Sequence, residues 1–522
     1  MDHLRLFDVT FNYLGDFKNN QESAFKIPTG NDISENNKLN EKISINGLIV
    51  NNRLSFDFAY DGVCDVDILA ETFKLRLMEI IDNLLVSDSI NTPSDYGIPV
   101  TSDDWKVITS VVDENLIEST SLLSPLQEGM LYLNELDKSS TQYILQNVFT
   151  LSGDLDEDVL DSALRLLSMR FDALRINFIY KNVSQPIEVI QKIKPIEAEI
   201  ITTTQNHYSK ILKDDIDRGF DLERDSLIRF KLINIKDFDD NGGDFKLVLT
   251  MHHIIIDGWS NAAWLNELFT SISSLIDGET EEYLSRQIQK QVQNSTNYHD
   301  YLQYISNIDK QEGLDYYNKL LEGYDEDINI PSIYPPESTD KQVEVLKTCI
   351  DGEDFIKLKK FASENNFTLN TITEFAYSIL INKYLGIDDV VFGKTVSGRN
   401  IPLKDIDNMV GLFINTVPFR LELDSDKSVI ELLGDIKMMD LDSDQYSYVP
   451  LHEIKHDKQE LIQTLYIYEN YYVDSSINQN IIADGFSVSL DSFREQTNYP
   501  LNIIFYDSDD SLVISFMYDP GK

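Results

Sequence analysis

Two distant segments of the chain repeat one pattern, and this repeat limits the possible folds more than any other feature of the sequence. Residues Arg53–Asp61 read RLSFDFAYD, and residues Ser511–Asp519 read SLVISFMYD. Both segments place apolar side chains at alternate positions and end in Tyr-Asp, which predicts the same half-buried β-strand twice. We therefore expect the chain to contain parts of two related domains.

The sequence after the two strands differs. The first copy is followed by ILAETFKLRLMEIIDNLL, an amphipathic run that predicts a helix. The expected buried face of this helix contains Leu69, Phe73, Leu77 and Ile80. The second copy is followed only by the end of the chain at Lys522. Residues 1–91 are thus expected to be the tail of one domain, and the last domain is expected to be truncated before its own helix.

A polar, turn-rich stretch at residues 87–104 marks the start of a new domain. The expected parts are residues 92–115 as a linker, residues 116–290 as a first lobe and residues 291–522 as a second, C-terminally truncated lobe. Strands are expected at Leu227–Ile235 and Phe245–Met251, and a helix is expected after its cap Asp156. This alternation of strands and helices predicts a mixed α/β or α+β fold.

The charge balance excludes several classes of function. The sequence contains 44 Lys and Arg against 89 Asp and Glu, which gives a formal net charge of −45 at pH 7. Such a surface repels nucleic-acid phosphates and anionic membranes. The two cysteines, Cys64 and Cys349, argue against a disulfide framework or a thiolate metal site. Because no stretch resembles a signal peptide or a membrane span, we expect a cytoplasmic globular protein.

A histidine pair at the end of an expected strand is the strongest candidate for a chemical site. The buried strand Leu247–Met251 runs into His252 and His253, and Asp257 and Gly258 follow shortly after. Adjacent strand residues point to opposite faces, so one imidazole can face a cleft while the other packs inside. The Asp257 carboxylate can fix the loop through an arginine, and Gly258 permits an unusual turn. Alternatively, both histidines are core residues and the Asp-Gly pair is a simple turn.

The segment His252–Gly258 resembles the His-His-x-x-x-Asp-Gly signature of condensation domains in nonribosomal peptide synthetases. Chloramphenicol acetyltransferase and epimerization domains share related forms of this signature. Other segments resemble further motifs of the family, in the family's order, over roughly residues 116–522. These segments are Leu123–Leu131, Arg170–Phe178, Val396–Asn400, Val410–Pro418 and Tyr448–Ile454. Within the second segment, Phe171, Asp172 and Ile176 depart from the family pattern, whereas both arginines are present.

The resemblance implies two lobes similar to chloramphenicol acetyltransferase, arranged as a V-shaped pseudodimer. It also implies an amide-forming acyltransferase, in which the α-amine of an aminoacyl group attacks the thioester of a peptidyl group. His253, the second histidine of the signature, is then the catalytic residue and either takes the amine proton or holds the amine. The substrates are tethered to the 4′-phosphopantetheine arms of upstream and downstream peptidyl carrier proteins. No directly bound cofactor or metal is implied.

The same resemblance gives supporting roles to the residues around the catalytic histidine. His252 and Asp257 are expected to be structural. Arg399 is the expected ionic partner of Asp257, with Arg175 as the alternative. Gly258 is expected to keep the loop close to the substrate channel.

Residues 1–91 resemble the C-terminal remnant of an epimerization domain. Phe11–Gly15 is similar to a late motif of such domains, and Thr92–Tyr96 is similar to the connector that follows them. Adenylation and epimerization domains of one assembly line are therefore implied as partners, and the expected reaction joins a D-configured donor to an L-configured acceptor. Two alternatives stay open: a condensation-like module that recruits partners without catalysis, and a stand-alone acyltransferase of the same superfamily.

Overall fold

The computed structural model describes most of the chain. The described residues are 9–17, 42–50, 53–60, 65–86, 93–97, 100–138, 140–152, 155–235, 244–293, 295–326, 344–456, 461–469, 480–483, 486–507 and 510–518. The chain divides into two compact units, Met1–Asn91 and Thr92–Lys522, and each unit is described by itself below.

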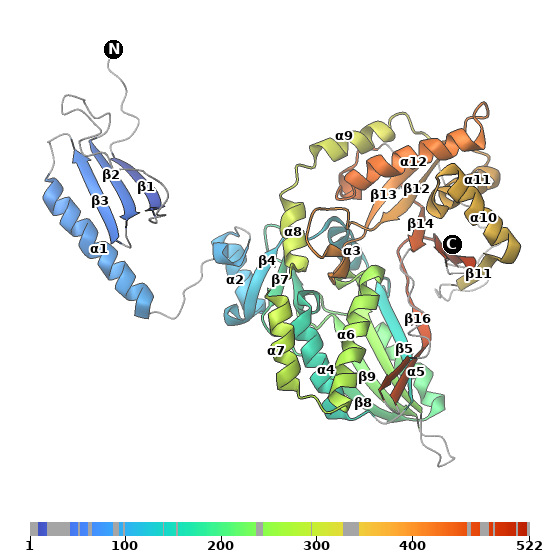
Figure 1. Ribbon diagram of the computed structural model, residues 1–522, viewed down its shortest axis with the longest axis horizontal. Helices are drawn as coiled ribbons and strands as arrows, with labels where there is room; N and C mark the ends of the chain where they lie inside the picture. The colour runs from blue at the N-terminus through green and yellow to red at the C-terminus, as the bar shows by residue number, and fades with distance from the viewer. Residues whose placement is uncertain are drawn as a thin grey trace. The chain divides into compact units, whose positions relative to one another are not determined.

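The first unit contains a three-stranded sheet and one long helix (Figure 1). Strand β1 (Val9–Phe17) runs parallel to β2 (Ile43–Val50), and β2 runs antiparallel to β3 (Arg53–Tyr60). Helix α1 (Val66–Val86) follows β3. The strand and the helix predicted from the first copy of the repeat are therefore confirmed.

Only part of the predicted helix face packs on this sheet. The ring of Phe73 contacts the rings of Phe56 and Phe58 edge-on, at centroid distances of 5.0 and 5.8 Å. Leu69 and Ile80, expected on the same buried face, are exposed. A sheet of three strands covers only a narrow stripe of a helix, so the predicted face was too wide.

Most of the segment predicted to be a linker is folded and belongs to the second unit. Helix α2 (Ser102–Val111) begins at a capping box made by Thr101 and Asp104. Tyr96 stacks on Trp105 at a centroid distance of 4.9 Å. Residues 93–97 and 100–115 thus share a small core with the sheet β4-β7-β6. Its strands are β4 (Ile117–Ser121), β6 (Ile176–Ile179) and β7 (Ile187–Gln191).

The first lobe is built on a six-stranded sheet with the order β15-β16-β5-β10-β9-β8. The strands are β5 (Ile144–Ser152), β8 (Ala198–Thr203), β9 (Ile228–Ile235), β10 (Asp244–His252), β15 (Asn480–Ala483) and β16 (Phe486–Arg494). β10 lies between β5 and β9 and is antiparallel to both. The strands predicted at Leu227–Ile235 and Phe245–Met251 are confirmed as β9 and β10.

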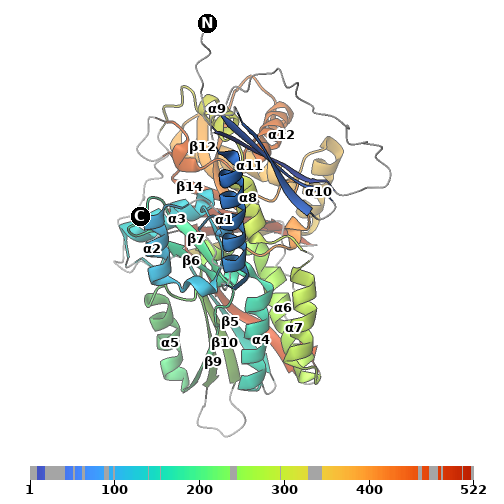
Figure 2. The ribbon, with the colours of Figure 1, turned by 90° about the vertical axis from the view of Figure 1, so that its left-hand side faces the viewer.

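Helices cover both faces of this sheet (Figure 2). The helices of the first lobe are α3 (Pro125–Leu136), α4 (Glu157–Arg170), α5 (Gln205–Asp217), α6 (Gly258–Ile276), α7 (Glu281–Val292) and α8 (Tyr298–Ser306). Leu247 and Leu249 of β10 belong to the large core with α4 and α6. Val248, between them, belongs to a smaller core beneath α5. The alternation along β10 therefore sorts its side chains onto two faces, as expected for a central strand.

The second lobe is built on another six-stranded sheet, with the order β11-β18-β17-β14-β12-β13. The strands are β11 (Glu344–Asp351), β12 (Asp389–Val396), β13 (Asn415–Glu422), β14 (Thr464–Glu469), β17 (Leu501–Asp507) and β18 (Ser511–Tyr518). The helices are α9 (Gln311–Leu320), α10 (Gly352–Asn365), α11 (Leu369–Leu385) and α12 (Val429–Gln445). This lobe has its own hydrophobic core. The predicted two-lobed, mixed α/β architecture is confirmed.

The repeat in the sequence corresponds to a repeat in topology. In the second lobe, β14 runs parallel to β17, and β17 runs antiparallel to β18. The first unit has the same arrangement, with β1 parallel to β2 and β2 antiparallel to β3. β3 and β18 thus hold the same position in two equivalent three-stranded arrangements.

The lobes exchange chain segments beyond the boundary expected at residue 290. Strands β15 and β16 follow β14 of the second lobe in sequence, yet β16 pairs with β5 of the first lobe. Helix α8 and the loop at 406–413 also contribute to the core of the first lobe. The cores therefore do not divide at one point in the sequence.

Candidate active site

The histidine pair lies where the central strand of the first lobe ends. β10 ends at His252, and His253–Ile255 form one turn of 3₁₀-helix before α6 begins at Gly258. The backbone N–H of His252 donates to the carbonyl oxygen of Leu227, at 3.0 Å, and that of His253 donates to the carbonyl oxygen of Tyr143, at 2.7 Å. Neighbouring strands thus hold both histidines on a rigid support.

His252 points into the protein. Its Nδ1 accepts a hydrogen bond from the backbone N–H of Ile254, at 3.1 Å, and its ring packs edge-on against Phe220. Burial, with a smaller effect of the neighbouring His253, lowers the pKa of His252 to about 3. His252 is therefore neutral at physiological pH and fixes the turn.

His253 is also buried, but its ring meets a carboxylate. Its Nε2 lies 3.3 Å from Oε1 of Glu495, and the side chains of the two residues are 8% and 21% exposed. Nδ1 of His253 is buried and has no hydrogen-bond partner among the described residues. Burial alone would lower the pKa of His253, but the hydrogen bond and the charge of Glu495 outweigh it, so the pKa lies above its ordinary value. The Glu495 carboxylate thus favours the protonated form of this imidazole.

Asp257 fastens the histidine turn to the second half of the chain. Oδ1 accepts hydrogen bonds from the backbone N–H and the hydroxyl of Ser260, at 2.9 and 2.7 Å, which caps the N-terminus of α6. Oδ2 accepts from the backbone N–H of Phe413, at 3.0 Å. The backbone N–H of Asp257 donates to the carbonyl oxygen of Gly411, at 3.0 Å. The loop between β12 and β13 is thereby held against the first lobe.

Arg399 is the ionic partner of Asp257. Its Nη2 lies 3.4 Å from Oδ1 of Asp257, and the two side chains are 3% and 0% exposed. Nη1 donates to the carbonyl oxygens of Ile406 and Met409, and the guanidinium lies over the ring of Phe413, 3.9 Å from its centroid. Arg399 therefore contacts both Asp257 of the histidine turn and the loop between β12 and β13.

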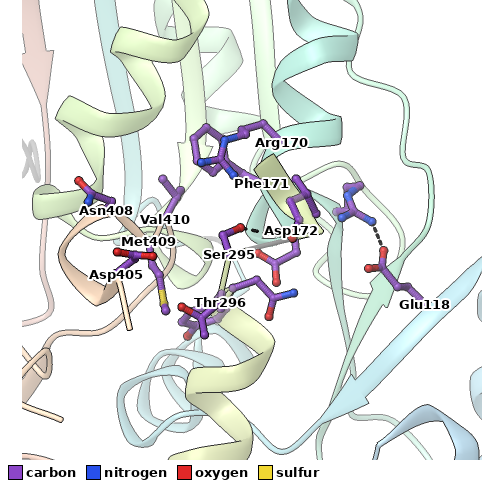
Figure 3. Close-up of a pocket in the computed structure, with 14 residues that line it drawn as sticks. Glu118, Arg170, Phe171, Asp172, Ser295, Thr296, Asp405, Asn408, Met409 and Val410 are labelled. Atoms are coloured by element: carbon purple, nitrogen blue, oxygen red, sulfur yellow. Dashed lines mark hydrogen bonds and ion pairs between the residues drawn. The ribbon is translucent and has the colours of Figure 1, made fainter. Parts of the chain in front are cut away.

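The alternative partner, Arg175, lies elsewhere. It forms an ion pair with Glu118 of β4, and its Nε donates to the carbonyl oxygen of Ser168, at 2.9 Å. Arg175 and Glu118 line a small pocket together with Asp172 and Arg170 (Figure 3). Arg175 thus supports the wall of this pocket and does not pair with Asp257.

The unusual turn expected at Gly258 is not found there. Gly258 is the first residue of α6 and is not among the glycines with positive φ. The unusual backbone is found instead in the partner loop, where Gly398 has φ +65°. A Cβ at Gly398 would collide with the carbonyl oxygen of Phe413. The glycine that the close contact requires is therefore Gly398, beside Arg399.

The sequence did not predict a role for two residues of the site, Gln127 and Glu495. Gln127, in the first motif, donates from Nε2 to the carbonyl oxygen of Ile254 at 3.2 Å and to Glu188 at 2.9 Å, and so supports the histidine turn from α3. Its place within the motif Leu123–Leu131 is the sequence signal that could have indicated this role. Glu495 has no such signal, because it follows strand β16, whose pairing with the first lobe depends on the tertiary fold.

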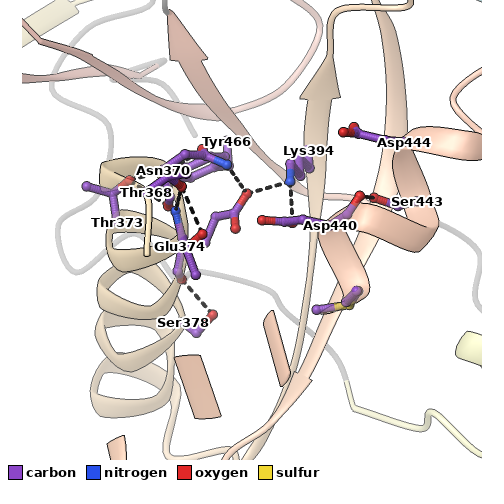
Figure 4. Close-up of polar contacts among 12 residues, drawn as sticks. Thr368, Asn370, Thr373, Glu374, Ser378, Lys394, Asp440, Ser443, Asp444 and Tyr466 are labelled. Carbon is purple, nitrogen blue, oxygen red and sulfur yellow. Dashed lines mark hydrogen bonds and ion pairs between the residues drawn. The ribbon is translucent and has the colours of Figure 1, made fainter. Parts of the chain in front are cut away.

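A second group of charged side chains lies in the second lobe (Figure 4). Nζ of Lys394 on β12 lies 2.6 Å from Oε1 of Glu374 and forms a second ion pair with Asp440 of α12. Burial opposes the charge of Lys394, but the two carboxylates raise its pKa above the ordinary value. Burial raises the pKa of Glu374, and the charge of Lys394 opposes this rise. This triad ties α11 and α12 to the sheet.

Two other kinds of site are absent from the described part of the chain. No group of three or more His, Cys, Asp or Glu there is arranged to hold a metal ion. No helix among those residues has the length and apolar character needed to cross a membrane.

The two lobes, with a His-His-x-x-x-Asp-Gly turn fastened between them, define the chloramphenicol acetyltransferase-like class. Within this class the chain belongs to the condensation-domain family, whose model matches residues 117–521. The histidine turn, Arg399 and Glu495 all lie within the matched range.

Comparison with curated proteins gives similar relatives among peptide synthases. Bacitracin synthase 1 of Bacillus licheniformis is 26% identical over 533 residues, which cover 98% of this chain and 10% of that protein. A mycosubtilin synthase of Bacillus subtilis is 28% identical over 536 residues, covering 98% and 20%. Bacitracin synthase 3 of Bacillus licheniformis is 32% identical over 416 residues, covering 77% and 6%. The chain thus spans a fifth or less of the length of each of these relatives.

Solved structures share the fold at low sequence identity. A four-domain nonribosomal peptide synthetase bound to AMP and glycine aligns with a TM-score of 0.61 at 16% identity, covering 78% of this chain and 31% of that one. The first condensation domain of the calcium-dependent antibiotic synthetase, in complex with a substrate analogue, aligns with a TM-score of 0.57 at 17% identity, covering 77% and 92%.

Proposed function

We propose that the chain forms a peptide bond between two carrier-bound substrates, with His253 as the catalytic residue. The observation that carries this proposal is the setting of His253: a rigid turn holds the imidazole at the end of the central strand, and a carboxylate meets its Nε2. His252, by contrast, is neutral and faces inward. The alternative that both histidines are equivalent core residues does not account for this difference.

The chemistry needs only positioning and the transfer of one proton. The acceptor amine nitrogen attacks the carbonyl carbon of the donor thioester, so that a C–N bond forms and the C–S bond breaks. The nitrogen loses one proton and the departing sulfur gains one, and His253 can carry that proton or hold the amine during attack. Since the α-amino group has an ordinary pKa near 8, it needs only a weak base. Alignment of two tethered reactants supplies a large part of the rate.

We assign the supporting roles from the contacts. His252 fixes the turn, Asp257 and Arg399 clamp the second-lobe loop to it, and Gly258 begins the helix that Asp257 caps. Arg175 maintains the adjacent pocket wall. None of these side chains needs to touch a substrate for the clamp to work.

We further infer that residues 1–91 are the end of an epimerization domain and that the donor is D-configured. Two observations support this inference. The first unit reproduces the arrangement of β14, β17 and β18, as a relative of the condensation fold would. The alignments with bacitracin synthase 1 and the mycosubtilin synthase each cover 98% of the chain, so they extend across both units. An upstream epimerization step would deliver a D-configured terminal residue to the site.

The test uses the full chain with a peptidyl carrier protein as donor and an aminoacyl carrier protein as acceptor. We expect amide product on the acceptor carrier by mass spectrometry, and its loss in His253→Ala. Faster turnover of an L-terminated than a D-terminated donor would reject only the D-donor assignment. Carrier binding without product would indicate a recruitment module. Product from free thioester and free amine, without need for carriers, would indicate a stand-alone acyltransferase.

A further inference from the structure

The strand that crosses between the lobes ends beside His253. β16 pairs with β5 from Ser487 to Arg494, and Glu495 follows directly. The guanidinium of Arg494 donates to the carbonyl oxygen of Ile144 at 3.2 Å. The segment that enters the site is therefore fixed at the residue immediately before Glu495.

Tyr143 completes the attachment from the other side. Its backbone N–H donates to the carbonyl oxygen of Gln496, at 2.8 Å, and its own carbonyl oxygen accepts from the backbone N–H of His253, at 2.7 Å. Tyr143 adopts a left-handed conformation, with φ 62°, which is uncommon for a bulky residue. Two backbone hydrogen bonds through one residue thus set the spacing between Glu495 and His253.

The side chain of Glu495 is not needed for this attachment. Among the residues that the structure describes, its ion pair with Nε2 of His253 is its only polar contact. The neighbours Arg494 and Gln496 make the bonds that hold the segment. A carboxylate that is placed on a fixed backbone and meets one imidazole nitrogen fixes the orientation of the ring and the nitrogen that carries the proton.

We propose that Glu495 is a positioning residue of this active site, which orients the imidazole of His253 through Nε2 and joins the site only when the crossing strand is seated on the first lobe. The charged groups facing His253 are then Glu495 from the crossing segment and Asp257 from the histidine's own turn, with the neutral His252 beside them. This role rests on the proposed function of His253, but the contact itself can be tested without any reaction.

The first test is an NMR titration of the full chain with ¹³C-labelled histidine, with the His253 signal assigned from its absence in His253→Ala. Glu495→Gln retains a hydrogen-bond acceptor but removes the charge. We expect it to lower the pKa of His253, because the carboxylate favours the imidazolium form. The matched control is Asp491→Asn on the same strand, which breaks the ion pair of Asp491 with Lys246 and leaves His253 untouched.

An unchanged His253 titration in Glu495→Gln would overturn the proposal, and equal shifts in both variants would assign the effect to strand seating instead.

The second test is the rate of amide formation against pH. If neutral His253 takes the proton, the rate rises with pH through the pKa of His253, and Glu495→Gln moves this rise to lower pH. Glu495→Ala should lower kcat on the order of 10- to 100-fold with an unchanged melting temperature. Equal rates for Glu495→Ala and the unmodified chain would also overturn the proposal for Glu495. An inactive unmodified chain would instead reject the proposed function, and the NMR titration would remain a valid test of the contact.

Discussion

Replacing Asp257 is predicted to damage the fold far more than replacing His253. Asp257→Ala removes the acceptor for two donors of Ser260, the N–H of Phe413 and the guanidinium of Arg399. The charge of Arg399 would then be buried without its partner. Removing one member of a buried ion pair costs about 3–5 kcal/mol, and loss of a helix cap contributes about 1 kcal/mol within the same network. We expect a loss of roughly 4 kcal/mol, a large part of the 5–15 kcal/mol typical of a domain.

His253→Ala should behave differently. Its Nδ1 makes no hydrogen bond among the described residues, and the Glu495 left behind keeps some contact with solvent. We therefore expect a cost of about 1 kcal/mol in stability with loss of most amide formation. Differential scanning fluorimetry and urea unfolding of the two variants measure the contrast. Similar melting temperatures for Asp257→Ala and His253→Ala would refute this division of roles.

Two matched variants separate the contributions of Asp257. Asp257→Asn retains an N-cap acceptor and removes the charge, so its difference from Asp257→Ala reports the cap. Combining Asp257→Asn with Arg399→Met removes the unpaired charge. The double variant should therefore be more stable than the sum of the single effects predicts.

Three further predictions concern other parts of the second unit. His252 keeps a pKa of about 3 when folded, while an unfolded histidine protonates near pH 6.5, so the unfolded state binds more protons between these values. The free energy of unfolding should therefore fall by roughly 3 kcal/mol from this group by pH 4.5, and His252→Asn should flatten that fall in urea titrations. Lys394→Met leaves the buried Glu374 and the half-buried Asp440 without their cation and should lower the urea midpoint strongly, whereas Glu374→Gln should have a small effect. Equal midpoints would contradict the triad's role. Gly398→Ala should lower the melting temperature or the soluble yield, because its Cβ would meet a backbone oxygen. The control Gly434→Ala, in α12, places its Cβ where no atom lies within 4 Å and should leave the melting temperature unchanged or raise it.

Local sequence pattern predicted the elements whose surroundings are simple. β9 and β10 have strong apolar patterns, and α4 begins after Asp156 as its cap predicts. The pairing of Asp257 with Arg399 was also predicted, because both residues lie in motifs of one family. These features depend on short stretches or on matched motifs.

Features set by tertiary packing could not be predicted in the same way. Residues 92–115 have the polar and turn residues of a linker, but Tyr96 and Ile108 are buried because a neighbouring sheet covers them. The boundary at residue 290 failed to divide the cores, because β16 alternates like any strand and its sequence does not specify which sheet it joins. Glu495 went unnoticed for the same reason.

The path of β16 has a practical meaning for anyone who recombines such chains. A hybrid that joins the first half of this chain to the second half of a relative takes β15, β16 and the residue at position 495 from the relative. The sheet under the histidine turn would then receive a strand and a carboxylate that did not evolve with it. Exchange boundaries should therefore follow the sheets, with residues 480–498 inherited together with the lobe on which they lie.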